Sequence, residues 1–596
     1  MSQATDTRQA TTLAALLRSA VESGSGPAMR FFRDGQWRRL SYPQVYERAH
    51  ELARGLIALG IEPGDRVAIL SVTRPEWTLA DLAILWAGAI GVPIYHTNSP
   101  HECEHVLRDS GARAIFCEDP EQVAKVAPLR ERLEGFEHVI AFTGESEGTL
   151  SLDELVARGG EVGDGEIERR LAAVKGSDPA TIVYTSGTTG APKGCVLTHD
   201  NLRSNLEMAV ARLELAGGPK KTFYLWLPLA HVLARVVQYV GLHIGAEIAY
   251  WRGDPKLLLE DIQEIEPTHL PSVPRVFEKI YNRALAGVED SPLRKRIFEW
   301  GLEIGRRWMI ARERGQRVPP GVAALYPLAD KLVLSKIRSL FGSRLEWAVT
   351  GAAPVEAEIL EFFHAAGVYV LEGYGMTEAS AVVTVNTIPE HRFGSVGKPL
   401  PGTEVRLGED GELQVRGPQV FAGYWGHEDA SREAVPDGWL RTGDLAHIDE
   451  DGYVYITGRK KEIIITSSGK NVTPASIENA LTQTRWIANA VVYGDRRPYI
   501  TALVTLDPTE IDALAEKLGV PADPAAMARD ARVREEIGRV IDEVNQRFAR
   551  IEQVKRFFIL ERDLTQEEGE LTPTGKVKRN VVYERYAQRF AEVYEG

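Results

Sequence analysis

Residues 181–197 read TIVYTSGTTGAPKGCVL, a loop rich in glycine and hydroxyl groups between two short apolar runs. Both runs are strand candidates, so the loop joins two strands and does not enter a helix. Its three glycines let the backbone approach a ligand and turn amide groups toward anionic oxygens. Four hydroxyls add hydrogen-bond donors and Lys193 adds positive charge. We therefore interpret the loop as a cradle for a polyphosphate.

A flexible linker is the alternative interpretation, but linkers of this composition seldom lie between two buried strands. Other common phosphate loops are absent from the sequence. Gly569 and Gly575–Lys576 are spaced one residue too far apart for a Walker loop, and Val577 stands where that loop needs Ser or Thr. No G-x-G-x-x-G follows a strand to suggest a dinucleotide site.

Around this loop, helical and strand-like segments alternate, which is typical of an α/β protein. Residues 42–59 predict a helix with Ser41 as its N-cap and Gly60 at its end. The other predicted elements of this part are strands at 66–70, 114–116 and 138–142, a helix through 79–86 and a helix-rich region at 292–339.

The character of the sequence changes after Gly402, where hairpin signals appear. The strand candidates are 403–407, 412–415 and 453–456, around turns at 409–411 and 450–452. An amphipathic helix is predicted further on, with one apolar face made of Ile537, Val540, Ile541, Val544, Phe548 and Ile551. We place a domain boundary at 457/458. The sequence thus predicts a large α/β body of several subdomains with a β-rich segment at 1–457, and a small α+β domain at 458–596.

Composition restricts the class of protein. The formal net charge is −14, which argues against a surface devoted to nucleic acid. Only three cysteines occur, which fits a reducing compartment. The N-terminus lacks signal-peptide order, and the longest charge-free apolar stretch, residues 82–95, is shorter than the roughly 20 residues of a spanning helix. We expect a soluble, cytoplasmic protein, and contact with the inner face of the membrane remains open.

His101-Glu102-Cys103-Glu104-His105 matches the H-E-x-x-H zinc-protease pattern. Such a site needs both histidines on one buried helix face, a third ligand and an open coordination position. Pro100 would place His101 in the first helical turn, and the surrounding charged residues indicate a solvated face. We do not expect zinc chemistry here.

The loop at 185–194 resembles the signature phosphate loop of the adenylate-forming superfamily, which includes acyl-CoA synthetases, luciferases and peptide-synthetase adenylation domains. Four further motifs are similar to those of the family and occur in the family's order. They are Gly373-Tyr374-Gly375-Met376-Thr377-Glu378, Gly438-Trp439-Leu440-Arg441-Thr442-Gly443-Asp444, Gly458-Arg459-Lys460-Lys461-Glu462 and Pro573-Thr574-Gly575-Lys576. The match covers nearly the whole chain.

The resemblance implies a two-step reaction, in which a carboxylate attacks the α-phosphate of ATP and a thiol then displaces AMP. ATP, Mg2+ and coenzyme A are the implied cofactor and substrates, and no nucleic acid is implied. The phosphate loop should hold the β- and γ-phosphates through Thr185, Ser186, Gly187, Thr188, Thr189, Gly190 and Lys193.

Other roles carry over from the family motif by motif. Tyr374, beside Gly375, should stack on adenine, with Gly351-Ala352-Ala353 as the opposite wall. Thr377 should contact the α-phosphate and Glu378 should hold Mg2+, which prefers oxygen ligands.

The C-terminal motifs supply the remaining contacts. Asp444 should grip both ribose hydroxyls, and Arg459 should add a ribose or phosphate contact. Lys576 is the expected catalytic cation, bridging the attacking carboxylate and the α-phosphate. Lys461 matches the hinge about which the family's mobile C-terminal lid rotates.

Several strings are similar to the long-chain fatty acyl-CoA synthetases. They are Leu227-Pro228-Leu229-Ala230-His231-Val232, the helical region 292–343, Ser467-Ser468-Gly469-Lys470-Asn471-Val472 and the TPTGKVKR form of the lysine motif. His231 should lie near the substrate carboxylate or the thioester tunnel. Arg235 stands where some long-chain members carry a gating tryptophan, so a gate is absent or built differently.

The sequence leaves the acid open. A medium-chain, aryl or luciferase-like substrate is the alternative to a long-chain fatty acid, and the core motifs do not separate these. A nucleotide-binding regulator without chemistry would be expected to lose Lys576 or Glu378, and both are present. Oligomeric state and metabolic pathway also stay open.

Overall fold

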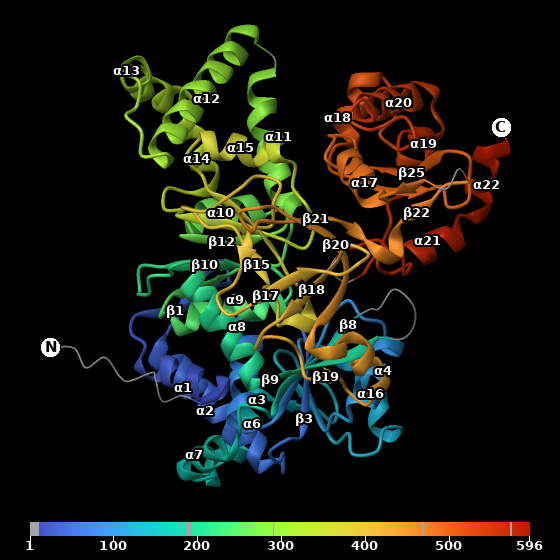
Figure 1. Ribbon diagram of the computed structural model, residues 1–596. Coiled ribbons are helices and arrows are strands. Elements are labelled where there is room, and N and C mark those ends of the chain that lie inside the picture. Colours follow the sequence, from blue (N-terminus) through green and yellow to red (C-terminus); the bar gives the residue numbers. More distant parts are fainter. Residues whose placement is uncertain (1–10, 186–191, 290, 468–469, 573–574, 596) are drawn as a thin grey trace. The chain divides into compact units, whose positions relative to one another are not determined.

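The computed structural model describes residues 11–185, 192–289, 291–467, 470–572 and 575–595. The chain forms two compact units, a larger one of residues 1–406 and 414–441 and a smaller one of residues 407–413 and 442–596. It passes between the units within strands β17 (Glu404–Leu407), β18 (Glu412–Arg416) and β20 (Leu440–Ile448). The predicted fold class, a large α/β body with a smaller α+β domain, is confirmed (Figure 1).

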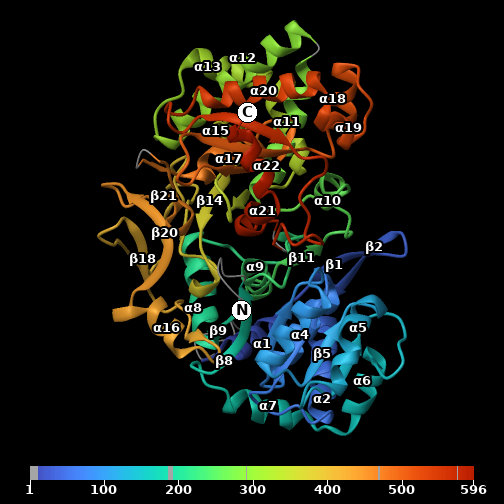
Figure 2. The same ribbon diagram turned by 90° about the vertical axis from the view of Figure 1, so that its right-hand side faces the viewer.

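An eight-stranded sheet of the larger unit has apolar residues on both faces. On strand β3 (Arg66–Leu70), Val67 and Ile69 point to a core shared with helices α2 (Tyr42–Ala58) and α3 (Pro75–Trp86). Ala68 and Leu70 point to a second core shared with α4 (Pro100–Ser110) and α5 (Pro120–Val126). This alternation explains why strand β3 reads as a continuous apolar run. Helices α4 and α5 lie side by side along β5 (Figure 2). The strands, in spatial order, are β19 (Gly423–Tyr424), β9 (Lys193–Thr198), β8 (Pro179–Thr185), β4 (Ile90–Ile94), β3 (Arg66–Leu70), β5 (Ala114–Cys117), β6 (His138–Ala141) and β7 (Leu150–Ser151).

A nine-stranded sheet forms the other framework of the larger unit. Its strands β1, β11, β10, β12, β13 and β14 run parallel, so their carboxyl ends share one edge. The strands, in spatial order, are β16 (Lys398–Pro399), β15 (Thr384–Val385), β14 (Val370–Tyr374), β13 (Trp347–Thr350), β12 (His269–Ser272), β10 (Thr222–Leu225), β11 (Glu247–Tyr250), β1 (Pro27–Arg33) and β2 (Gln36–Ser41).

The helix-rich region predicted at 292–339 consists of helices that contact one another at one end of the larger unit (Figure 1). It contains α12 (Pro292–Glu313), α13 (Pro320–Ala329), the π-helix η4 (Asp330–Leu334) and α14 (Ser335–Arg338), next to α11 (Pro274–Glu289). The other helices of the larger unit are α1 (Leu13–Ser23), α2 (Tyr42–Ala58), α3 (Pro75–Trp86), α4 (Pro100–Ser110), α5 (Pro120–Val126), α6 (Leu152–Arg158), α7 (Asp164–Ala173), α8 (His199–Arg212), α9 (Val232–His243), α10 (Leu258–Ile265), α15 (Ala357–Ala365) and α16 (Glu428–Ala434). Within the described residues, every helix is too short or too polar to cross a bilayer.

The smaller unit is an α+β fold. Strand β20 pairs antiparallel with β21 (Val454–Arg459), and a three-stranded sheet contains β24 (Ile487–Tyr493), β25 (Ile500–Leu506) and β26 (Val554–Ile559). Its other elements are β22 (Ile464–Ile465), β23 (Asn471–Val472), α17 (Pro474–Thr482), α18 (Ile511–Leu518), α19 (Pro524–Arg529), α20 (Ala531–Asn545), α21 (Arg579–Arg585) and α22 (Ala587–Glu595).

The amphipathic helix of this unit is shorter than the sequence predicted. Helix α20 ends at Asn545, so Phe548 and Ile551 lie beyond it, and Ile551 is exposed. The cause is local, because the Asn545 side chain donates to the Val554 carbonyl and accepts from the Val554 amide, both at 2.9 Å. This pair of hydrogen bonds turns the chain into strand β26. Ile537, Ile541 and Val544 are buried as predicted.

Candidate active site

The glycine-rich loop joins strands β8 and β9 of the eight-stranded sheet as an antiparallel hairpin. Thr185 and Lys193 are paired across this hairpin, so the hydroxyl and the amine stand at the two ends of the loop. The hairpin topology agrees with the two strands predicted around the loop. The other predicted phosphate-binding residues lie outside the described residues, namely Ser186, Gly187, Thr188, Thr189 and Gly190.

Glu378 lies close to the lysine end of this hairpin, with Tyr424 between them. The Tyr424 hydroxyl donates to Glu378 Oε1 at 2.9 Å, and Lys193 Nζ lies 5.5 Å from the centre of the Tyr424 ring. Burial and the nearby Glu378 carboxylate raise the pKa of Tyr424, so its hydroxyl stays a donor. Lys193 and Glu378, which are 185 positions apart in the sequence, therefore belong to one polar cluster.

Cys195 connects the same cluster to the other end of the loop. Its thiol lies 3.9 Å from the Thr185 hydroxyl, and Cys195 is paired with Tyr424 between strands β9 and β19. Burial raises the pKa of this thiol well above its ordinary value, and the neighbouring Glu378 carboxylate raises it further. A thiol held neutral in this way is a packing residue and not a nucleophile.

Three predicted segments follow the carboxyl ends of parallel strands in the nine-stranded sheet. Gly351-Ala352-Ala353 follows β13, Tyr374 ends β14 and the string leading to His231 follows β10. Ligands of open α/β sheets bind outside such strand ends. The backbones of the first two segments lie close, because a Cβ on Gly351 would stand 3.0 Å from the Gly373 carbonyl oxygen.

The backbone after Tyr374 is crowded and strained. A Cβ on Gly375 would stand 1.5 Å from the Ala381 carbonyl oxygen, so only glycine fits there. Ala352 and Ala381 adopt φ values of +71° and +97°, a region that non-glycine residues rarely enter. Strain of this kind tends to persist where function requires a specific backbone. Thr377 is buried in the 3-10 helix η6 (Thr377–Ala379) at the end of this segment.

His231 caps the amino end of helix α9, where its Nδ1 accepts from the Leu233 amide at 3.2 Å. The side chain is half-buried. Its backbone is held in the same turn, because the His231 amide donates to the Pro228 carbonyl at 2.9 Å.

Arg235, at the position where the sequence comparison raised the question of a gate, is built into the core of the larger unit. Its guanidinium lies 2.5 Å from Asp81 and donates to the Thr181 hydroxyl at 2.6 Å and to the Tyr239 hydroxyl at 3.1 Å. The side chain is only 2% exposed. A residue held by three partners in this way supports strand β8, which leads into the glycine-rich loop, and has no room to swing as a gate.

In the smaller unit, Asp444 and Arg459 are paired across strands β20 and β21. Arg459 Nε lies 2.9 Å from Asp444 Oδ1, and the Asp444 side chain is almost completely buried while Arg459 is exposed. A neighbouring backbone amide, Gly443 N–H, donates to Glu412 at 2.8 Å and fixes the preceding turn. Two predicted ribose contacts thus come together in the structure.

Lys576 lies in a tight turn of the smaller unit. Its amide donates to the Thr572 hydroxyl at 3.0 Å, the Thr572 amide donates to its carbonyl at 2.7 Å, and Gly575 supplies a left-handed φ of +77°. Desolvation of the ammonium and the Arg459 guanidinium lower the pKa of Lys576, while Asp444 and Glu462 oppose this shift. The residue remains exposed, and Pro573 and Thr574 of its motif lie outside the described residues.

Two ion-pair networks that the sequence did not indicate hold this turn in place. Buried Glu570 accepts from Arg562 and from the Tyr586 hydroxyl, and these partners hold the pKa of Glu570 at about 2. Arg579 bridges Glu478 and Glu462, the last residue of the 3-10 helix η8 (Lys460–Glu462). Lys461, the predicted hinge residue, is exposed in the same helix.

Tyr424 and Glu570 are therefore functional candidates that sequence reasoning missed. Each is a single residue outside any motif, and its importance depends on side-chain contacts that the motifs do not contain. The sequence offered one local indication for Tyr424, which is that a second aromatic residue, Trp425, follows it directly.

The zinc-protease pattern forms no metal group in the part of the chain that is described. It lies on helix α4, where His101 is exposed and His105 Nε2 is hydrogen-bonded to the Pro192 carbonyl at 2.9 Å. The one group of three ligands among the described residues lies elsewhere.

Comparison with known proteins covers both units. The family model of the AMP-binding enzyme matches residues 17–425, and that of the AMP-binding enzyme C-terminal domain matches residues 461–596. The chain is 40% identical to the long-chain-fatty-acid–CoA ligase FadD15 of Mycobacterium bovis, covering 94% of this chain and 93% of the relative. It is 32% identical to the long-chain-fatty-acid–CoA ligase ACSBG2 of Gallus gallus, covering 94% and 78%. The adenylation domain of a carboxylate reductase from Mycobacterium chelonae has the same fold, with a TM-score of 0.77, 22% identity and coverage of 98% and 91%.

Proposed function

The chain belongs to the AMP-binding enzyme family, and from this premise we propose that it is an AMP-forming fatty acid–CoA ligase. It activates a fatty acid with ATP to an acyl-adenylate and pyrophosphate, and then transfers the acyl group to coenzyme A with release of AMP. The observation that carries the proposal is that residues from distant motifs converge within each unit. Lys193 and Glu378 meet around Tyr424, and Arg459, Asp444 and Glu462 surround Lys576.

In the first half-reaction, the larger unit binds and orients the nucleotide. The β8–β9 hairpin brings the Thr185 hydroxyl and the Lys193 amine to the β- and γ-phosphates, together with the loop residues between them. Tyr374 stacks on adenine at the carboxyl end of β14, with Gly351-Ala352-Ala353 on the other side. Gly375 keeps the backbone beside the Tyr374 ring packed closely against Ala381, where no side chain fits.

Glu378 is suited to hold Mg2+ on the phosphates. One carboxylate oxygen is occupied by the Tyr424 hydroxyl, and the residue is only half-buried, so the other oxygen can serve as a ligand. A single protein carboxylate plus phosphate oxygens is the set that Mg2+ commonly takes. When bound, the ion neutralises phosphate charge, and Thr377 positions the α-phosphate beside it.

Lys576 supplies the cation at the reacting centre. Its ammonium bridges the fatty acid carboxylate and the α-phosphate, which attracts the nucleophile and stabilises the charge that builds up at phosphorus. Asp444 and Arg459 hold the ribose beside it. Partial desolvation strengthens such charge interactions and is also the cause of the lowered pKa of Lys576.

We place the domain boundary of this reaction at 457/458, so that residues 458–596 act as a mobile lid. Rotation about Lys461 carries Lys576 to the α-phosphate for adenylation and away from it for thioester formation. The exposed position of Lys461 in a short 3-10 helix fits a hinge, because few contacts would be lost when its backbone angles change.

The acid is a long-chain fatty acid, the substrate class for which the relatives FadD15 and ACSBG2 are named. His231 lies at the carboxyl edge of the nine-stranded sheet and orients the carboxylate or the thioester. Because Arg235 is locked in the core, access to the acyl site does not depend on that residue. A CoA-dependent AMP-release assay across chain lengths tests the proposal. Palmitate-like acids should outcompete acetate and benzoate, and a preference for the shortest acids would overturn it.

Delivery of such a substrate is served by an apolar stripe on the helical region. Leu325, Leu328 and Leu332 are spaced by three and four residues and are 42%, 51% and 39% exposed. Lys331 and Lys336 lie nearby in the chain, as in helices that rest on anionic lipid. We therefore place the enzyme in the cytoplasm with peripheral contact to the inner face of the membrane. Replacing the three leucines by serine should reduce sedimentation with anionic vesicles, and unchanged sedimentation would contradict this placement.

A further inference from the structure

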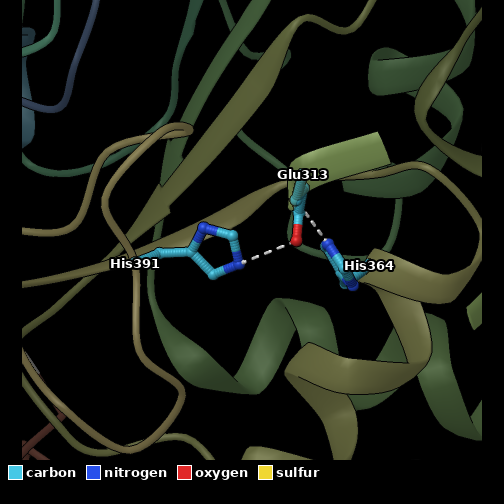
Figure 3. A group of neighbouring side chains, drawn as sticks. All are labelled: Glu313, His364 and His391. Atoms are coloured by element: carbon cyan, nitrogen blue, oxygen red, sulfur yellow. Dashed lines mark hydrogen bonds and ion pairs between the residues drawn. The ribbon is translucent and has the colours of Figure 1, made fainter. Parts of the chain in front are cut away.

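Glu313, His364 and His391 form a compact group far from the phosphate-binding hairpin in sequence. Glu313 ends helix α12, His364 lies in the last turn of α15, and His391 lies on the loop between β15 and β16. One ligand atom from each lies within 4.8 Å of the other two. Figure 3 shows both imidazoles directed at the Glu313 carboxylate. No motif used in the proposed reaction includes these residues.

The hydrogen bonds of the group fix which ring nitrogens face its centre. His364 Nε2 lies 2.6 Å from Glu313 Oε1, and His391 Nε2 lies 3.9 Å from Glu313 Oε2. His391 Nδ1 contacts the Ile388 carbonyl at 3.0 Å, and a carbonyl only accepts. Nδ1 therefore carries a hydrogen, and Nε2 is the ring nitrogen that faces the carboxylate.

Histidines that bind metals commonly anchor the second ring nitrogen on a backbone carbonyl in this way. The Tyr369 hydroxyl donates to Glu313 Oε1 at 3.1 Å and orients the carboxylate. The rings of Tyr369 and Phe393 border both imidazoles and limit their rotation.

We propose that Glu313, His364 and His391 form a binding site for a divalent transition metal, with Zn2+ as its natural occupant. Two imidazoles and one carboxylate suit zinc and disfavour Mg2+, which prefers oxygen ligands. Tetrahedral coordination needs ligand atoms about 3.3 Å apart, so small side-chain rotations bring the group into place. Solvent completes the coordination, because the Glu313 side chain is 26% exposed.

The metal ties three separate segments of the larger unit together. The loop that carries His391 also supplies the Gly394 amide, which donates to buried Glu372 at 3.0 Å. Glu372 precedes Gly373 and Tyr374 on strand β14. Zinc at this site therefore stabilises the loop that supports the end of that strand, and is not a participant in the adenylation chemistry.

Equilibrium dialysis of the full chain against Zn2+, with the bound metal quantified, tests the site. The variants are His391→Gln and Glu313→Gln, which leave the buried His364 intact, and the matched control is His101→Gln in the exposed H-E-x-x-H string. One equivalent should bind to the wild type and to the control. Loss of a direct ligand should weaken binding by about 100-fold or more, since even supporting residues are worth 10–100-fold. Equal binding by all four proteins, or no binding by the wild type, would overturn the proposal.

A second measurement identifies the ligands and does not depend on enzyme activity. Co2+ in place of Zn2+ should give visible absorption bands of a nitrogen and oxygen site, without thiolate charge transfer, because all three cysteines are buried. The thermal midpoint of the wild type should rise with Zn2+ concentration, and that of His391→Gln should not. Thiolate bands, or an equal rise in both proteins, would place the metal elsewhere and refute the assignment.

Discussion

Arg235 offers a direct test of whether the position at which some long-chain members carry a gating tryptophan holds a structural residue in this chain. Replacing it with methionine keeps much of its volume but removes the charge that faces Asp81, whose side chain is fully buried. Asp81 would keep only the Tyr239 hydroxyl at 2.7 Å and the Gln238 amide at 3.3 Å. The variant therefore leaves a buried carboxylate without its cation.

The expected cost follows from burial of the pair. Removing one partner of a buried ion pair destabilises a protein by about 3–5 kcal/mol. No discount for solvent applies, because the two side chains are 2% and 0% exposed. The double variant Asp81→Leu/Arg235→Met removes both charges and should recover part of this loss. A residual cost of about 1–3 kcal/mol is expected because the Tyr239 and Gln238 groups lose their acceptor.

Differential scanning calorimetry of the transition of the larger unit measures these differences. For a unit of this size, about 1 °C of midpoint corresponds to 1 kcal/mol, so Arg235→Met should lower the midpoint by about 3–5 °C. AMP release measured well below that midpoint should show an unchanged order of preference among acyl chain lengths, since the Arg235 side chain is enclosed in the core of the larger unit.

A gating role would give the opposite pattern. If Arg235→Met changed the preference among chain lengths and left the midpoint where it was, the structural interpretation would be wrong. A double variant less stable than either single variant would also contradict the reasoning, since the ion pair would then not couple the two positions.

Three further outcomes follow from the structure. Lys576→Ala should reduce ATP–pyrophosphate exchange by about 10²–10³-fold while largely sparing CoA transfer from supplied acyl-adenylate. The control Lys578→Ala should leave both activities unchanged. Near-normal exchange in Lys576→Ala would show that Lys576 does not take part in the reaction. Burial raises the pKa of Glu372 from 4.5 to about 8, so the folded state favours its protonated form. The contribution of protonated Glu372 to folding stability is full below pH 4.5 and is lost as the pH rises through about 8. Glu372→Gln should therefore raise the thermal midpoint at pH 8 and not at pH 4. Parallel pH profiles of the midpoint in the wild type and the variant would disprove this. Gly375→Ala should unfold the nucleotide segment, since its Cβ would lie 1.5 Å from a carbonyl oxygen, whereas Gly373→Ala, at 3.2 Å, should be milder in thermal melting.

Much of the fold could be predicted because its signals are local. Helix α2 begins at Tyr42, where the Gln44 side chain accepts from the Ser41 amide at 2.8 Å, and it ends one residue before the predicted Leu59. Strand β3 has the predicted bounds, 66–70, because both of its faces are buried. Helix α20 was extended too far because its end depends on Asn545 reaching Val554, and periodicity contains no information about such a contact.

The predicted site shows the same division between local and long-range information. Motifs named Glu378 and Asp444 because each stands in a short characteristic string. They did not name Tyr424, whose partner Glu378 lies 46 positions away, or Glu570, whose partners Arg562 and Tyr586 lie outside the motifs. For the phosphate loop, Thr185 and Lys193 frame a hairpin as expected, and the roles of its residues stay predictions to be tested by substitution.

The histidines make the limit of motif reasoning concrete. His101 and His105 have the spacing of a zinc site, yet one is exposed and the other is bonded to a backbone carbonyl. His364 and His391 have no characteristic spacing, yet the fold directs both at the Glu313 carboxylate. Spacing along a helix brings two ligands to one face but cannot supply a third, and it cannot fix the ring nitrogen that carries the proton. Tertiary structure supplies the third ligand and orients the rings, so contacts between elements, and not spacing, indicate the proposed metal site of this chain.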